Sequence, residues 1–485
     1  MIPDDNATWM RLRTAICLTL GVAGAAALLK QMLTGNSVVG AGIFAVIVVF
    51  GLFLWLQQRY WMLVVLAMIV PMPVIPFGPR WMILSELVVP LAFIFLLANR
   101  AVHKTGRVWL VSGPGITPLA YTAWAAMIYS MNPSGFLMMG SGLTGARFYL
   151  KIALGLLSFF ILSNQKIRDR EALWVIFLIV AGSVGQAIHG IAQWKLGVYQ
   201  AYEGQFYTWQ PALTTPLLWM SILLFSVYGV DLLLRVPSWQ GLLFSAMVVT
   251  SLFTGKRMGV AGIAAVPLVT ALVRRHGLLR CAVWAAVLVL MLGCMVAGHG
   301  RMFRLPLLIQ RSLSYMPGLW DVQVEEGIGY DFRQRLRERA LDIVKDKPLF
   351  GLKGYALTIE DLPWQSVWGQ LSDPDMAASG RNWHTTWLGI AADFGIPAAV
   401  IWGLFYLQFV WTAHKTRQIA AITRRQHTLV LMIYVYLVIE IARSMTGGHS
   451  ALLAYDMWWL YGLVVAVSRT LAEEPPAPAD AGTGV

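Results

Sequence analysis

The sequence predicts an all-α polytopic integral membrane protein with about 12–14 transmembrane helices and one long extramembrane loop that contains amphipathic helices. Of its 485 residues, 58% are hydrophobic and only 13% are charged, which is about half the charged fraction of a soluble protein. Apolar runs of nearly twenty residues recur along the chain, and each could cross roughly 30 Å of hydrocarbon as a helix. This composition excludes an ordinary soluble enzyme.

Fourteen segments have the length and apolarity of a membrane span. They are 14–33, 38–56, 60–76, 82–98, 116–131, 148–164, 172–194, 211–234, 239–254, 257–273, 279–297, 384–411, 428–443 and 452–469. The segment at 60–76 contains the prolines of "PMPVIP", so a re-entrant or irregular piece is an alternative there.

The distribution of basic residues orients these spans. With the N-terminus in the cytoplasm, 18 of the 37 Lys and Arg residues lie in cytoplasmic segments, 8 at outer connections and 11 in the long segment 298–383. Long loops are exempt from the positive-inside rule. The net charge of +13 is therefore a topological signal and an attraction to anionic lipid, and it does not indicate nucleic-acid binding.

This orientation divides the chain into four parts. We expect an N-terminal transmembrane bundle at 1–297, an outer loop at 298–383, C-terminal transmembrane helices at 384–469 and a disordered cytoplasmic tail at 470–485. A loop of this length among short connections indicates that function resides there.

The middle of the loop, "DFRQRLRERALDIVKDKPLFG" at 331–351, has the pattern of an amphipathic helix. Phe332, Leu336, Ala340 and Ile343 or Val344 recur at helical spacing, so one stripe can pack on the membrane domain. Four arginines, at positions 333, 335, 337 and 339, occupy the remaining faces. They suit either a solvated face with i,i+4 ion pairs or a site that binds an anion.

Further basic residues lie at the outer ends of the predicted spans. Arg147 and Lys151 open one span, Arg257 opens another, and Arg80 and Arg443 lie at outer ends. Arginines gathered around such a loop would suit a phosphate or a diphosphate. Three acidic residues, Asp393, Glu440 and Asp456, lie in or near spans, where they either pair helices or orient the arginines.

These residues resemble a known family. The stretch "RQRLRERALDIVKDKPLFGLKGY", followed about thirty residues later by "HTTWLGIAADFGIPAAVIW", is similar to the O-antigen ligase and polysaccharide polymerase superfamily, and "TGKRMGVAGI" resembles an upstream segment of the same family. Arg337 stands where the family has an aromatic residue, and Thr385 stands where it has asparagine.

The resemblance implies roles for particular residues. Arg257 and Arg333 would hold the diphosphate of a polyprenyl-diphosphate-linked glycan, with Arg147 and Arg337 as further diphosphate-binding residues, and His384 would be the general base. The spacing of the arginines leaves Arg335 as an alternative to Arg333. The site would face the periplasm from the bacterial inner membrane.

The chemistry of such a transfer fits these side chains. A donor outside the cytoplasm must carry its own leaving group, and fixed arginines can stabilise a departing diphosphate in place of a metal ion. A histidine with a pKa of about 6.5 can deprotonate an acceptor hydroxyl at neutral pH. We expect inverting, metal-independent transfer without a cofactor.

The acceptor and the class of function remain open at this level. The acceptor could be lipid A–core, as in a ligase, another lipid-linked repeat, as in an O-antigen or exopolysaccharide polymerase, or a protein hydroxyl. The expected partners are the glycan donor, one of these acceptors and membrane lipid, with no nucleic acid. A different class, a transporter or flippase of lipid-linked sugars, would show repeated halves and a site near the midplane.

Overall fold

The computed structural model describes a defined part of the chain. It covers residues 59–70, 73–77, 80–103, 113–133, 143–144, 146–195, 210–234, 238–322, 330–354, 357–358, 385–445 and 450–473, together with residues 51, 52, 56 and 324. The predicted spans at 14–33 and, except for a few residues, 38–56 lie outside this part.

The described chain is almost entirely helical. The helices are α3 (Trp61–Ile69), α4 (Leu84–His103), α5 (Ile116–Met131), α6 (Ala146–Ser163), α7 (Asp169–Lys195), α8 (Thr214–Tyr228), α9 (Trp239–Leu252), α10 (Arg257–Arg274), α11 (Leu278–Gly298), α12 (Leu307–Leu313), α14 (Tyr330–Asp346), α16 (Thr386–Phe394), α17 (Ile396–Arg417), α18 (Arg424–Ser444) and α19 (Ser450–Glu473). Two short antiparallel pairs accompany them, β1 (Pro73–Phe77) with β2 (Arg80–Ile83) and β3 (Leu143–Thr144) with β4 (Leu357–Thr358).

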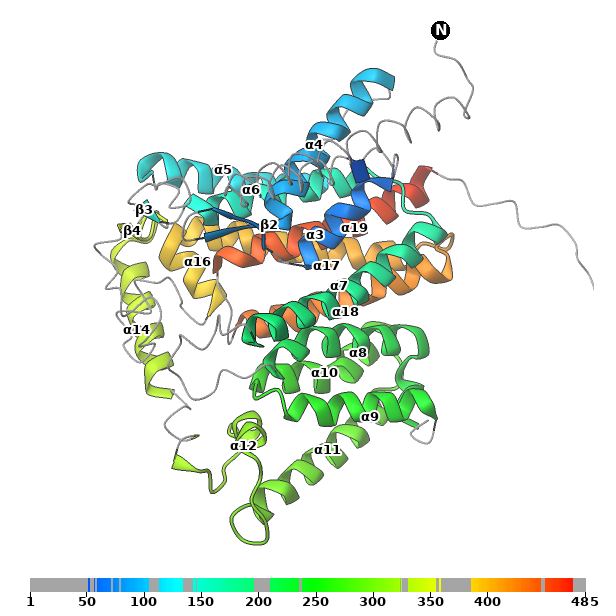
Figure 1. Cartoon of the computed structure of the whole chain (residues 1–485), viewed down its shortest axis with the longest axis vertical. Coiled ribbons are helices and arrows are strands. Elements are labelled where there is room, and N and C mark those ends of the chain that lie inside the picture. The colour runs from blue at the N-terminus through cyan, green and yellow to red at the C-terminus, as the bar shows by residue number, and fades with distance from the viewer. Residues whose placement is uncertain are drawn as a thin grey trace, which may run out of the picture.

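The long helices lie side by side, and α14 crosses one end of the bundle (Figure 1). Helix α19 packs along α6 and also contacts α17 and α18, while α8, α9 and α10 form a neighbouring group that α18 joins to the rest. Short connections explain only the neighbours in sequence, such as α8 with α9 and α9 with α10, whereas α19 with α6 and α18 with α8 are contacts between helices far apart in the chain. Helices α12 and α14 lie at the same end of the bundle (Figure 1).

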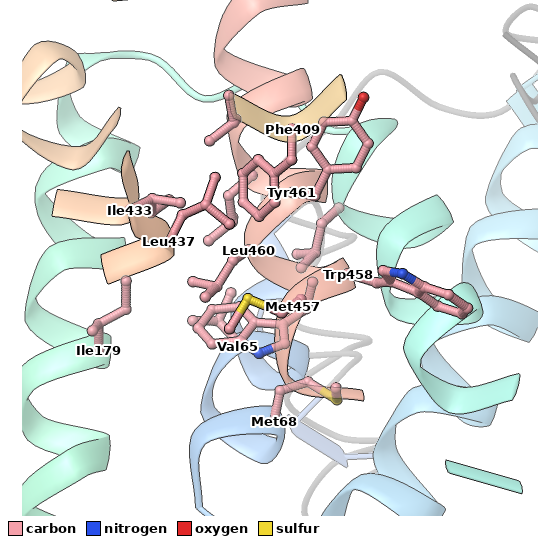
Figure 2. Packing of buried hydrophobic residues seen from close by; sticks show 14 of the residues in the cluster. Val65, Met68, Ile179, Phe409, Ile433, Leu437, Met457, Trp458, Leu460 and Tyr461 are labelled. Carbon is pink, nitrogen blue, oxygen red and sulfur yellow. The ribbon is translucent and has the colours of Figure 1, made fainter. Parts of the chain in front are cut away.

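A core rich in aromatic side chains holds the bundle together. Trp458 and Tyr461 of α19 are fully buried, and they meet Phe405 and Phe409 of α17 at ring-centroid distances of 4.8–6.3 Å. Figure 2 shows part of this packing, with Tyr461 beside Phe409 and with residues of α3, α7 and α18 nearby. Large rings placed edge to face add specific contacts to the burial of apolar area.

The prediction of a polytopic membrane protein is confirmed. Among the described residues, six helices are long and apolar enough to cross a membrane, namely α6, α7, α10, α11, α17 and α18. Three shorter apolar stretches, in α4, α8 and α9, accompany them. Many apolar side chains of α11 face outward, for example Leu290 at 68% exposure, as expected of a surface that meets lipid tails.

Three predicted spans differ from the structure. In the predicted span at 211–234, α8 ends at Tyr228, Gly229 has φ = 69°, and a separate 3-10 turn follows at Val230–Leu234. Helix α3 ends at Ile69, and the proline-rich segment after it forms the β1–β2 hairpin. The segment 60–76 is therefore irregular, which was the alternative to a continuous span. The segment predicted as one span at 384–411 divides at Gly395 into α16 and α17. The break occurs because Gly395 has φ = 85°, which a right-handed helix cannot contain.

Charged side chains lie together at the ends of the helices, as the distribution of Lys and Arg predicts. Residues predicted to share the cytoplasmic side contact one another: Arg425 pairs with Asp169 at 2.8 Å, and Lys166 pairs with Glu473 at 3.0 Å. Residues predicted to lie on the outer side, among them Arg147, Arg257 and Arg443, occur at the opposite ends of the same set of helices. The bundle therefore has two distinct charged ends.

Candidate functional site

Helix α14 is amphipathic and packs on α16, as its sequence pattern predicts. Leu336 and Ala340 are fully buried against Ala392 of α16. Arg335, Arg337 and Arg339 are exposed on the remaining faces. The apolar stripe therefore fixes the helix, and the arginines between its members are presented away from the membrane domain.

Two turns fix the position of α14 relative to α16. They are residues 347–354 and residues 392–396, and together we call them the double turn. The backbone N–H of Leu352 donates to the carbonyl of Ala392, that of Gly354 donates to Asp393, and that of Ile396 donates to Pro348, each at 2.8 Å. Three backbone hydrogen bonds thus join segments that lie about forty residues apart. Both helices end at this joint, which therefore fixes their C-terminal ends relative to each other.

Neighbouring helices surround the double turn. Trp124 of α5 donates its indole N–H to the carbonyl of Phe394 at 2.8 Å and stacks on Phe350 with a ring-centroid distance of 5.9 Å. A Cβ atom at Gly354 would lie 1.8 Å from the hydroxyl of Tyr149 of α6. The helix that carries Arg147 is therefore in contact with the joint that positions α14 and α16.

Glycine is required where the two turns approach each other. At Gly395, which has φ = 85°, a Cβ atom would lie 2.0 Å from the carbonyl oxygen of Leu349. At Gly351, which has φ = 54°, it would lie 2.3 Å from that of Ala392. The glycines of the "PLFG" and "FGIP" motifs are thus explained by one close contact between two backbones.

We expect Gly395→Ala to destabilise the protein by about 2–4 kcal/mol, because strained φ and an overpacked contact each cost about 1–3 kcal/mol. The melting temperature of the detergent-purified protein measures this. Gly293→Ala is the matched control, since nothing lies within 4 Å of a Cβ at that position of α11. Equal melting temperatures for the two variants would contradict the close contact between Gly395 and the carbonyl of Leu349.

The start of α16 is tied to the end of α18. Trp387 donates its indole N–H to the hydroxyl of Ser444 at 2.9 Å, and Ser444 directly follows Arg443. The buried hydroxyl of Thr385 has no hydrogen-bond partner among the described residues. The chain runs directly from His384 to Thr385, and His384 itself lies outside the described residues.

Charged side chains from five helices meet at this end of the bundle. We call this set the outer cluster: Glu86, Arg147, Lys151, Lys256, Arg257, Glu440, Arg443 and Asp456. Its most buried part is the pair of Arg147 and Glu86, in which Nε donates to Oε1 at 2.7 Å and Nη2 donates to Oε2 at 3.2 Å. Glu86 keeps only 2% side-chain exposure and Arg147 keeps 18%. This fork holds the Arg147 guanidinium in one orientation.

A second part of the outer cluster is built on α18 and α19. Arg443 donates to Glu440 at 3.0 Å, one turn away on α18. Asp456 of α19 interacts electrostatically with Glu440, Lys151 and Arg443. Tyr455, beside it in the chain, lies within electrostatic reach of Arg147 and donates to Ser85 at 2.5 Å. The two parts of the cluster are therefore continuous.

The third part is the start of α10. Arg257 donates through Nε to the carbonyl of Arg311 in α12 at 3.3 Å. Partial desolvation by protein and, after it, the charge of Arg443 lower the pKa of Lys256, although its side chain still reaches the surface. Positive charge thus extends from α10 to α18, and the loop segment around α12 covers one side of it.

The five residues predicted for the site are placed differently. Arg147 and Arg257 lie in the outer cluster. Arg337 is exposed on α14. Arg333 belongs to the first turn of α14, but its side chain, like the whole of His384, is outside what the structure describes. The structure thus brings α6, α10 and the α14–α16 pair to one end, without defining distances between the five side chains.

The outer cluster also contains charged residues outside the five predicted for the site. The sequence placed Arg443 among the outer arginines that would suit a phosphate, and gave Glu440 and Asp456 as residues that pair helices or orient the arginines. Their mutual contacts require the packing of α18 on α19. In the sequence, Lys256 is notable only because it directly precedes Arg257. Within the described ranges no three His, Cys, Asp or Glu side chains gather closely enough to hold a metal ion.

One comparison with known proteins identifies a family. Residues 242–403 match the family described as O-antigen ligase. The matched region begins in α9 and ends in α17, so it includes the start of α10, helix α14, the double turn and α16. No curated protein matches the chain. This match covers about a third of the chain and supports a resemblance of residues 242–403 to the O-antigen ligase and polymerase superfamily, within a polytopic membrane protein.

Proposed function

We propose that the chain transfers a glycan from a polyprenyl-diphosphate donor to a hydroxyl of lipid A–core, by an inverting and metal-independent reaction. The observation that carries the proposal is the convergence at one end of the bundle. The start of α10, the α14–α16 pair and the outer cluster all lie there, and the α16 start is tied to Ser444 by Trp387. This is the arrangement that a membrane-anchored diphosphate needs, because its lipid tail stays beside the helices.

The diphosphate-binding role falls to Arg257, Arg333, Arg337 and Arg147. Arg257 donates through Nε to the carbonyl of Arg311, and this bond holds its guanidinium group at the start of α10. Arg147 donates two hydrogen bonds to Glu86, which fix the orientation of its guanidinium group beside the proposed diphosphate site. Arg337 is exposed on α14 and reaches the donor from the loop side. Guanidinium groups bind phosphate oxygens with paired donors, which suits a leaving diphosphate.

The general base is His384, which precedes the start of α16. In this role it removes the proton from the acceptor hydroxyl as that oxygen attacks the anomeric carbon, while the bond to the diphosphate breaks on the opposite face. The unpaired hydroxyl of Thr385 supplies a further polar contact for the sugar or the acceptor.

The site faces the periplasm in this proposal. A reporter enzyme that is active only outside the cytoplasm should therefore be active when fused near residue 360 and inactive when fused near residues 165 or 420. The distribution of basic residues between the two ends of the bundle supports this orientation. An inactive fusion near 360 combined with an active one near 420 would reverse it.

The direct test is transfer by the purified protein. Detergent-solubilised chain is incubated with a polyprenyl-diphosphate-linked glycan and with lipid A–core as acceptor, and the product is measured by mass spectrometry. Formation of lipid A–core carrying the glycan supports the proposal. Joining of donor repeats to one another would assign a polymerase instead. Movement of unaltered donor between the leaflets of vesicles, without transfer, would assign a flippase.

A further inference from the structure

A separate cavity lies at the end of the bundle opposite α14, where α8, α10 and α17 end and α18 begins. It has a volume of about 540 Å³. Its lining includes Arg274, Arg417, Arg424, His276, His427 and Ser226. None of the described residues that line it is acidic. The cavity is therefore strongly basic, and it is large enough for more than a single small ion.

Two of its arginines are held in place by helix ends. Arg274 donates through Nη2 to the carbonyl of Ser226, near the end of α8, and Arg417 donates through Nη1 to the carbonyl of Val273, near the end of α10. Arg417 also lies over the ring of Tyr434, with its guanidinium carbon 5.8 Å from the ring centroid. These contacts orient the guanidinium groups and leave most of their five N–H donors for other acceptors.

Two buried polar atoms at the cavity have no partner among the described residues. They are the Nε of Arg274 and the hydroxyl oxygen of Ser226. Buried polar groups in native proteins nearly always have a hydrogen-bond partner. Both residues line the cavity, so a bound acceptor would satisfy these atoms after a small shift of the Arg274 or Ser226 side chain.

An acidic residue near the cavity already has a basic partner. Asp231 interacts electrostatically with Arg274, but its carboxylate forms an ion pair with Arg280. Helix α18 begins at Arg424, where Thr423 and Gln426 form a capping box, so the positive end of its helix dipole also points to this region. The field thus favours an anion.

We propose that this cavity binds a phosphate-bearing anion through Arg274, Arg417 and Arg424. Guanidinium groups match the geometry of phosphate oxygens with paired donors, and basic pockets between transmembrane helices are suited to lipid head groups. The phosphate belongs either to a phospholipid of the surrounding leaflet or to a soluble phosphate compound. The site is distinct from the outer cluster, and it does not depend on glycan transfer.

The test compares two neighbouring arginines in the full-length protein. Arg424→Gln removes a lining charge, whereas Arg425→Gln removes the same charge from the next residue, which pairs with Asp169 at 2.8 Å and does not line the cavity. Both side chains are exposed at the start of α18, so both variants should fold. Arg424→Lys keeps the charge without the planar fork and should bind with intermediate affinity.

Two probes separate the possible sources of phosphate. In one arm, phosphatidylglycerol is titrated onto detergent-purified protein and bound lipid is counted by native mass spectrometry, with phosphatidylcholine as the reference. In the other arm, binding of inorganic pyrophosphate is measured at equilibrium. We expect Arg424→Gln to weaken binding about tenfold in one arm, and Arg425→Gln to change it less than twofold.

Each outcome decides the proposal. A loss in the phosphatidylglycerol arm assigns a lipid head group, and a loss in the pyrophosphate arm assigns a soluble phosphate. Pyrophosphate that binds equally to both variants is bound elsewhere, for example at the outer cluster. Equal behaviour of Arg424→Gln and Arg425→Gln in both arms overturns the proposed site.

Discussion

Replacing His384 with alanine should lower the rate of glycan transfer about 10²–10⁴-fold, the usual contribution of a general acid–base group. The donor should remain bound, because the proposed diphosphate contacts come from arginines on α10 and α14. Turnover is measured with the purified protein in the transfer assay, and donor retention is measured by mass spectrometry of the same preparation. The expected signature is therefore lost turnover with retained donor.

His384→Gln distinguishes catalysis from anchoring at the membrane interface. Glutamine keeps a polar head group next to Trp387, so an anchoring histidine would tolerate the change, whereas a base would not. His189→Gln, which alters a partly buried histidine on α7, is the control for loss of a histidine as such. Near-normal turnover in His384→Gln would remove His384 from the chemistry.

Arg257→Ala should lower transfer about 10²–10³-fold, the range observed when one preorganised donor to a developing negative charge is removed. Unlike the change at His384, this one should also weaken retention of the donor. Lysine should restore little, because it keeps the charge but lacks the planar set of donors. The same assay applied to Arg333→Ala and Arg335→Ala determines which arginine of α14 contacts the phosphates.

A control is needed because Arg257 also has a structural contact. Its hydrogen bond to the carbonyl of Arg311 contributes about 0.5–1.5 kcal/mol to stability, so the melting temperature of Arg257→Ala should fall only slightly. Arg304→Ala removes an exposed arginine before α12 and should leave transfer unchanged. Equal activity of Arg257→Ala and Arg304→Ala would exclude Arg257 from the site.

The sequence predicted features that depend on short-range pattern. Apolar runs identify membrane helices because the hydrocarbon thickness sets their length. The stripe of Leu336 and Ala340 identifies α14 because its helical spacing is local. The alternation of basic segments predicted which helix ends lie together, and the contacts of Arg425 with Asp169 and of Lys166 with Glu473 agree with it.

The short-range pattern of the sequence does not predict which charged side chains pair with each other. Arg147 pairs with Glu86 across 61 positions of the chain, and Asp456 meets Lys151 and Arg443 from two other helices. Nothing in the neighbouring residues of Arg147 indicates that two of its donors are engaged. Which helices are adjacent is decided by the packing of a whole bundle, so such pairs appear only when the tertiary structure is present.

By itself, then, the sequence determined that the chain is a polytopic helical membrane protein, that an amphipathic helix ends at a proline–glycine turn, and that motifs of one family occur in order. Only the tertiary structure decided that the predicted span at 384–411 breaks at Gly395 and that the turn around Gly351 closes on it. A single glycine in an apolar segment is compatible with a continuous helix. It becomes a break because the carbonyl of Leu349, from a distant segment, occupies the space that a side chain would need.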